Sequence, residues 1–140
     1  MIKRGWQQII CILVVIAIIV EIVGCSKKDI FVKKEKDLDF TVVEQGDIPE
    51  KLGEEIANKK EKGFKITYID NGYLYIAVGY GARETGGYNV LVKDLYLTKN
   101  AIYMNTSLVG PRENEMVLKA TTYPYIVIKT MDRGVNVVFT

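Results

Sequence analysis

Hydrophobic and polar residues alternate over much of the chain after residue 63, which is the pattern of β-strands with one buried face. Residues 64–68 (FKITY) follow this period. In residues 73–78 (YLYIAV), the aliphatic residues 74, 76 and 78 share one face and residues 73, 75 and 77 share the other. Asn71-Gly72 stands between the two runs, and both residues accept the positive φ angles of a type I′ turn. The pattern therefore predicts a β-hairpin.

Later runs predict further strands of similar length. Residues 88–97 and 101–106 predict a second hairpin about Lys99-Asn100. Residues 116–122 and 125–130 predict strands on either side of Pro124, which marks a corner or an edge because it cannot donate to a ladder. A turn at residues 132–134 (DRG) leads into a last predicted strand at residues 135–139.

One helix is expected between residues 47 and 63, after a strand that begins near Leu38. In the strand, residues 38, 40 and 42 are apolar and share one face. Asp47 is the expected N-cap, with Glu50 completing a capping-box-like pair and Pro49 in the first turn. Residues 48, 52 and 56 form the apolar face, and Gly63 ends the helix. Short strands with one N-terminal helix predict an α+β fold, mainly antiparallel β, as a sandwich or open barrel with the helix against the sheet.

The first 25 residues have the pattern of an export signal. Residues 9–20 are apolar without interruption, and the charged residues before them are basic. Residues 22–25 (IVGC) then look like a bacterial lipobox. We expect residues 1–24 to be a lipoprotein signal peptide, cleaved after Gly24, with Cys25 carrying the lipid. An uncleaved transmembrane helix and an ordinary secretory signal are the alternatives.

The expected signal divides the chain into three parts. After the signal peptide, residues 25–37 form a lipid-anchored flexible tether that is rich in lysine and acidic residues. Residues 38–140 form the β-rich domain. The location expected is the extracytoplasmic face of a bacterial cell membrane. Contact of the lysines in the tether with anionic lipid remains an alternative role for that segment.

Composition excludes several kinds of chemistry. The chain has no histidine, which removes His-dependent catalysis and His-containing zinc sites. Its two cysteines fall in the expected signal peptide and at the lipidation position, so we expect no thiolate metal site and no cofactor. A net charge of +2 argues against nucleic acid as a partner. Glu113 and Glu115 lie in a polar loop and are interpreted as solvated, so no catalytic residue is assigned.

The most unusual stretch is residues 79–88 (GYGARETGGY). It lacks the Gly-Lys-Ser/Thr and the helix start of a phosphate-binding loop. It is either a structural connection or a protein-binding loop, since tyrosine and arginine often carry interface energy. In the second reading the glycines fix its shape. The candidate partner-binding residues are Tyr80, Arg83, Glu84, Gly86, Gly87 and Tyr88.

Three short segments carry a resemblance to a known family. Residues 85–90 (TGGYNV), 122–127 (TYPYIV) and the closing 135–139 (VNVVF) resemble the C-terminal domain of PrcB-like proteins. That family takes its name from a lipoprotein subunit of a surface protease complex, thought to bind and stabilise the protease. The resemblance implies a non-enzymatic lipoprotein that acts on a protein partner.

Together these observations predict a lipid-anchored, extracytoplasmic protein-binding module. Its expected partners are the membrane, through the lipid on Cys25, and another protein, with a surface protease as the candidate that the resemblance suggests. Two alternatives stay open. The domain could inhibit a protease directly, or it could be a lipoprotein that binds a small ligand or a glycan through its tyrosines.

Overall fold

The computed structural model describes residues 5–9 and 32–140. Contacts divide the chain into two units, Met1–Phe31 and Val32–Thr140, and all elements named below belong to the second. Cys25 and most of the expected signal peptide lie outside the described residues. Among the residues that are described, no helix combines the length and the apolar character that a membrane crossing needs.

Residues 32–140 fold into two four-stranded sheets with two short helical segments. The first sheet has the order β1 (Lys36–Asp37), β5 (Asn89–Leu97), β6 (Ala101–Val109) and β8 (Asn136–Phe139). The second sheet has the order β2 (Thr41–Val42), β7 (Tyr125–Met131), β4 (Tyr73–Gly79) and β3 (Phe64–Asp70). The helical segments are η2 (Gln45–Asp47) and α2 (Glu50–Lys59).

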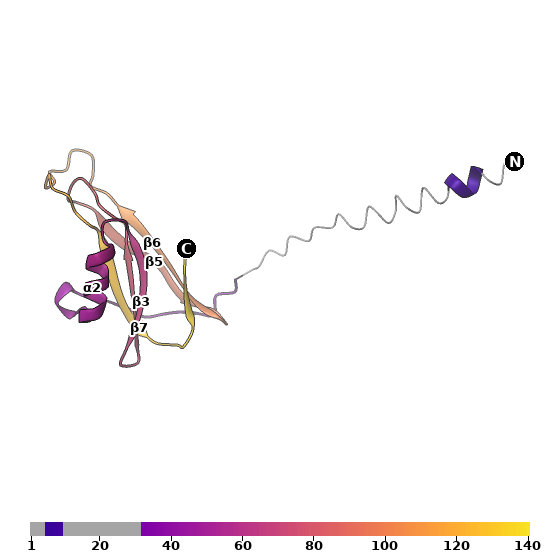
Figure 1. The fold of residues 1–140 in the computed structure, drawn as a ribbon, viewed down its shortest axis with the longest axis horizontal. Coiled ribbons are helices and arrows are strands. Elements are labelled where there is room, and N and C mark those ends of the chain that lie inside the picture. The colour runs from indigo at the N-terminus through magenta and orange to yellow at the C-terminus, as the bar shows by residue number, and fades with distance from the viewer. Residues whose placement is uncertain (1–4, 10–31) are drawn as a thin grey trace. The chain divides into compact units, whose positions relative to one another are not determined.

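The second sheet is the middle of three layers, with α2 on one side and the first sheet on the other (Figure 1). Successive side chains of β4 (Tyr73–Gly79) face opposite sides of the second sheet, so the strand contributes both to the contact with the first sheet and to the contact with α2. Its Leu74, Ile76 and Val78 pack toward Ile102 of the first sheet, whereas Tyr75 and Ala77 belong to the cluster around α2. The sheets do not close into a barrel, so the expected α+β fold with a β-sandwich is confirmed.

The helix is found where the periodicity predicts it, but its start differs. Leu52 and Ile56 are buried against the sheet, as expected from their spacing. The solvent-exposed side carries an ion pair four residues apart, with 2.5 Å between Lys59 Nζ and Glu55 Oε1. The predicted N-cap is wrong, because Asp47 ends η2 and Pro49 precedes the first helical residue with no side-chain cap. The extended backbone at Ile48 separates the two segments.

Both predicted hairpins are present. Asn71 and Gly72 have φ angles of 48° and 78°, as a type I′ turn between β3 and β4 requires. The second hairpin joins β5 and β6 around Lys99-Asn100, with a bulge between Val92 and Asp94. The strand pairs are antiparallel except that β8 lies parallel to β6.

The predicted strand from Leu38 is divided between the two sheets. β1 pairs with β5 and β2 pairs with β7, so the chain changes sheets around Asp39, whose carbonyl accepts a hydrogen bond from the Thr130 hydroxyl. Only Leu38 of the predicted apolar face is buried; Phe40 and Val42 are exposed. The expectation of one continuous strand is therefore wrong, because a crossing segment does not keep one face toward one core.

Backbone pairing reaches into the segment expected to be a tether. The amide of Glu35 donates to the carbonyl of Leu97 at 2.9 Å, and Lys34 Nζ lies 5.4 Å from the Tyr96 ring centroid. A hydrogen bond from Lys34 to Asp37, with the charge of that carboxylate, raises the pKa of Lys34. The boundary at residue 38 stays a prediction, but residues 34–37 contact the domain.

Candidate functional site

Two loops lie side by side at one end of the sandwich, residues 80–88 between β4 and β5 and residues 110–124 between β6 and β7. Arg83 and Thr122 exchange two backbone hydrogen bonds of 2.8 and 2.9 Å. The amide of Gly86 donates to the carbonyl of Leu118 at 2.8 Å. These contacts join the two segments, which we call the loop pair, into one braced unit.

Residues 116–122, within the loop pair, do not form the predicted strand. Their one bridge in the described chain is that between Arg83 and Thr122. The neighbouring segment is a glycine-containing loop and supplies no continuous ladder, so the alternating pattern stays unpaired. The prediction of a strand here is wrong, and the side chains of Met116 and Leu118 are exposed to solvent.

Tyr80 anchors the loop pair to both sheets. Its amide donates to the carbonyl of Pro124 at 3.0 Å, and its hydroxyl forms a 2.8 Å hydrogen bond with the hydroxyl of Thr106 on β6. The ring packs against the core between the sheets. Tyr80 was predicted to contact a partner, but it is half-buried, and most of its side chain contacts the rest of the domain.

Arg83 also contacts its own loop. Its Nη2 donates to the carbonyl of Tyr80 at 3.1 Å, and its guanidinium carbon lies 5.9 Å from the Tyr88 ring centroid. Within the described residues its Nε is buried without a hydrogen-bond partner. Arg83 and Tyr88 are half-buried, whereas Glu84 is exposed. Glu84 is thus the predicted charged residue that is most open to a partner.

The two glycines in the candidate set have different local roles. Gly87 has a φ of +86°, and a Cβ there would lie 2.8 Å from Val117 Cγ1 and 3.0 Å from Pro111 Cβ. Gly86 has no positive φ, and its nearest neighbour would be Leu118 Cβ at 3.4 Å. Gly87 thus permits the close approach of the two loops, as the sequence interpretation expected of a glycine here.

The most exposed apolar side chains of the loop pair were not predicted as site residues. Met116 is 98% exposed and Leu118 is 70% exposed. Both lie on the segment that is bonded to Gly86, next to the loop that the sequence singled out. The sequence pattern placed them in a predicted strand, so they were not considered as site residues. The sequence feature that could have identified them is the polar run before them, PRENE at residues 111–115. No turn follows this run that would pair Met116 and Leu118 with a neighbouring strand.

The polar run shapes the end of the loop pair. Glu115 accepts a 2.8 Å hydrogen bond from the amide of Arg112 and so closes a local turn, while Glu113 is exposed. This use of Glu115 fits the non-catalytic interpretation. An open hollow of about 610 Å³ lies here, lined by Gly87, Asn89, Val109, Gly110, Arg112, Glu113, Asn114 and Glu115.

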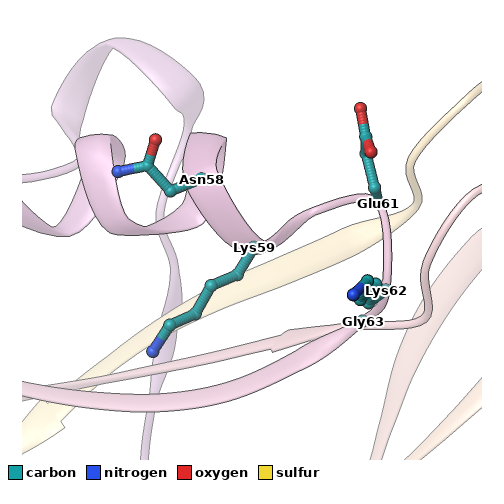
Figure 2. A pocket seen from close by; sticks show the side chains of 5 residues that line it. All are labelled: Asn58, Lys59, Glu61, Lys62 and Gly63. Atoms are coloured by element: carbon teal, nitrogen blue, oxygen red, sulfur yellow. The ribbon is translucent and has the colours of Figure 1, made fainter.

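A second hollow, of about 330 Å³, follows α2. Figure 2 shows its lining residues, Asn58, Lys59, Glu61, Lys62 and Gly63. The side chains of Lys59 and Glu61 point in different directions, so the lining groups do not converge on one point. Among residues 5–9 and 32–140, no three acidic, cysteine or histidine side chains are grouped to hold a metal ion.

The tyrosines considered for glycan binding are mostly occupied by protein contacts. Tyr96 and Tyr103 stack face to face on the first sheet, with centroids 5.3 Å apart and planes 5° apart. Lys34 covers Tyr96 from the neighbouring segment. Two stacked rings, one of them covered by a lysine, form a packed pair rather than an open platform.

A comparison with protein families identifies the region that contains the loop pair. A family model described as PrcB C-terminal matches residues 74–131. The matched residues begin in β4, end in β7 and include the whole loop pair. The resemblance predicted from the sequence is confirmed, although it was expected to continue to Phe139. No curated protein and no solved structure matches the chain.

Proposed function

Starting from a domain that is PrcB-like, we propose that the chain is a protein-binding module that associates with a subunit of a protease complex. The observation that carries this proposal is the exposure of Met116 and Leu118 on a braced loop. Apolar side chains held in solvent by a fixed backbone favour association, because burying them releases water without a large ordering cost. Methionine suits such a contact because its side chain adapts to a partner.

The family match supports the nature of the partner. The resemblance is to a family named for an accessory subunit of a protease complex, and an accessory role is non-catalytic. In this role the partner-binding surface consists of Met116, Leu118 and Glu84. The residues that hold the loop in its conformation are Tyr80, Arg83, Gly86, Gly87 and Tyr88.

We further propose that Cys25 carries a lipid and places the domain on the extracytoplasmic face of a bacterial cell membrane. The support is the sequence pattern of residues 1–25, with its basic start, its apolar run and its lipobox. Anchoring would raise the local concentration of the domain around partners at the same surface.

The test is cross-linking in the native cell envelope with the tagged full-length chain. We expect a protease-complex subunit to be captured, and Met116→Ser with Leu118→Ser to reduce its capture at least about tenfold. The control is Ile69→Ser with Met131→Ser, which removes two other exposed apolar side chains, 59% and 57% exposed, from the far ends of β3 and β7. Equal capture by the two double variants, or capture without any protease-complex subunit, contradicts the proposal. Assaying the captured protease separates stabilisation from direct inhibition.

A further inference from the structure

We propose that β6 accepts an extended, acidic segment of a protein partner as an added strand, at the edge formed by the backbone of Thr106 and Leu108. This proposal rests on the proposed protein-binding function and names the chemistry of the partner. Addition of a strand to an open sheet edge is a common mode of peptide recognition, because the edge supplies backbone donors and acceptors in register.

Among the described residues, β8 pairs with only the first part of β6 and leaves the rest of that edge uncovered. The parallel pairing runs from Ala101 to Met104, and the last hydrogen bond is from the amide of Thr140 to the carbonyl of Met104 at 3.0 Å. Backbone groups alternate between the two sides of a strand, so Thr106 and Leu108 direct their N–H and C=O to the same side as Met104. No backbone partner for them is found in the part of the chain that the structure describes.

A hollow of about 410 Å³ lies at the start of β3 and the end of β4. Tyr80 lines it, and the hydroxyl of Tyr80 is hydrogen-bonded to the side chain of Thr106 at the open edge. Lys65 also lines it, and its Nζ lies 5.5 Å from the ring centroid of Phe139, the partner of Met104 in the β6–β8 ladder. These two contacts link the lining residues to β6 and to β8, so a strand added at the uncovered part of β6 would pass close to the hollow.

The charge around the edge selects the occupant. Two lysines, Lys62 and Lys65, line the hollow, and none of its six lining residues is acidic. Glu61 belongs to the neighbouring hollow, and its side chain points in a different direction from that of Lys62 (Figure 2). An incoming strand with carboxylates would meet these ammonium groups, whereas a second copy of the chain would bring two more lysines to the same place.

The test uses the full-length chain in detergent and a synthetic eight-residue peptide in which valine alternates with glutamate. We expect this peptide to slow amide hydrogen exchange at Thr106 and Leu108 at least about tenfold. The same peptide with lysine in place of glutamate should have no such effect. Absence of protection by the acidic peptide, or equal protection by both peptides, overturns the proposal.

Two proline variants locate the binding to one edge. Leu108→Pro removes an outward N–H of β6, and we expect it to abolish protection of Thr106 by the peptide. Thr67→Pro is the control, and the peptide should still protect Thr106 in it. The two-residue turn of the β3–β4 hairpin makes Asp70 and Tyr73 a hydrogen-bonded pair, so alternation directs the Thr67 amide to the outer edge of β3 and not to β6. Peptide protection that persists in a folded Leu108→Pro variant refutes the assignment.

If Leu108→Pro does not fold, charge reversal decides. Lys62→Glu with Lys65→Glu should exchange the preference from the acidic to the lysine-containing peptide, and an unchanged preference overturns the proposal. Protection of Thr106 and Leu108 that appears without peptide and depends on protein concentration also overturns it, in favour of a second copy. Because the peptide assay does not use the captured partner, it can fail while the Met116 and Leu118 experiment succeeds.

Discussion

The hydroxyl of Thr122 donates a 2.7 Å hydrogen bond to the carbonyl oxygen of Thr85, which precedes it by 37 residues. This bond lies between the two backbone contacts of the loop pair, the Arg83–Thr122 bridge and the Gly86–Leu118 hydrogen bond. A half-buried side chain thus fixes the spacing of the loops. The exposed Met116 and Leu118 depend on this spacing, because they belong to the segment that it holds.

We therefore expect Thr122→Val to loosen the loop pair. The change keeps the shape of the side chain and removes one hydrogen bond, which lowers the free energy of unfolding by about 1 kcal/mol. It should also speed amide hydrogen exchange at Gly86. Thr121→Val is the matched control, since Thr121 is exposed and has no side-chain hydrogen bond among the described residues. Equal exchange at Gly86 in the two variants contradicts this role of Thr122.

A second prediction concerns the hydrogen bond between the sheets. Tyr80→Phe removes the bond to Thr106 and keeps the ring in the core, so we expect a loss of about 1 kcal/mol in the free energy of unfolding. The double variant Tyr80→Phe with Thr106→Val should lose less stability than the sum of the losses in the two single variants, because the bond can be broken only once. Chemical denaturation measures both. Tyr73→Phe, at an exposed tyrosine, should leave stability nearly unchanged, and a comparable loss there would show that the effect is not specific to the bond.

Local patterns predicted the elements whose stability is local. The β3–β4 hairpin follows from Asn71-Gly72 and from alternation on both sides of the turn. The burial of Leu52 and Ile56 follows from a spacing that any amphipathic helix shows. In these elements the same residues decide both the local conformation and the face that is buried.

Two elements could not be predicted because they depend on distant partners. The segment around Leu38 alternates like one strand, but its two halves pair with different sheets. The segment that contains Met116 alternates like a strand and finds no ladder. A two-residue alternation shows that a strand with one buried face is possible, but whether it forms depends on the segments that pack beside it.

For the candidate site, the sequence predicted where the glycine-rich loop lies but not the contacts that its residues make. The glycine-rich loop does form a surface at the end of the sandwich, and Gly87 has the positive φ that such a loop needs. The contacts of Tyr80 and Arg83 are directed inward to Thr106 and to the backbone, which their residue types did not reveal. Tyrosine and arginine suit an interface and a loop anchor equally well.

A third prediction tests the lipid anchor. Cells grown with a radioactive fatty acid should label the full-length chain, and Cys25→Ala should abolish the label, because the thiol of Cys25 is the expected acceptor. Cys11→Ala is the matched control and should leave labelling intact, since the lipobox interpretation places Cys11 in the part that is cleaved off. Labelling that survives Cys25→Ala contradicts the lipobox interpretation.

The adjacent glycines of the loop pair give the sharpest prediction about its shape. Gly87→Ala should lower the free energy of unfolding by about 1–3 kcal/mol, because its Cβ would meet Val117 and Pro111 and its φ of +86° disfavours any side chain. Gly86→Ala should cost less than about 1 kcal/mol, since its Cβ would make only an ordinary contact with Leu118 and its φ is not positive.

Thermal and chemical denaturation of the two variants measure the difference. The two changes add the same methyl group one residue apart, so composition and overall exposure hardly differ between them. We also expect Gly87→Ala, and not Gly86→Ala, to weaken partner capture, because separating Gly87 from Val117 displaces the segment that carries Met116 and Leu118. Equal stability of the two variants would mean that the close approach at Gly87 does not determine how the loop pair is held.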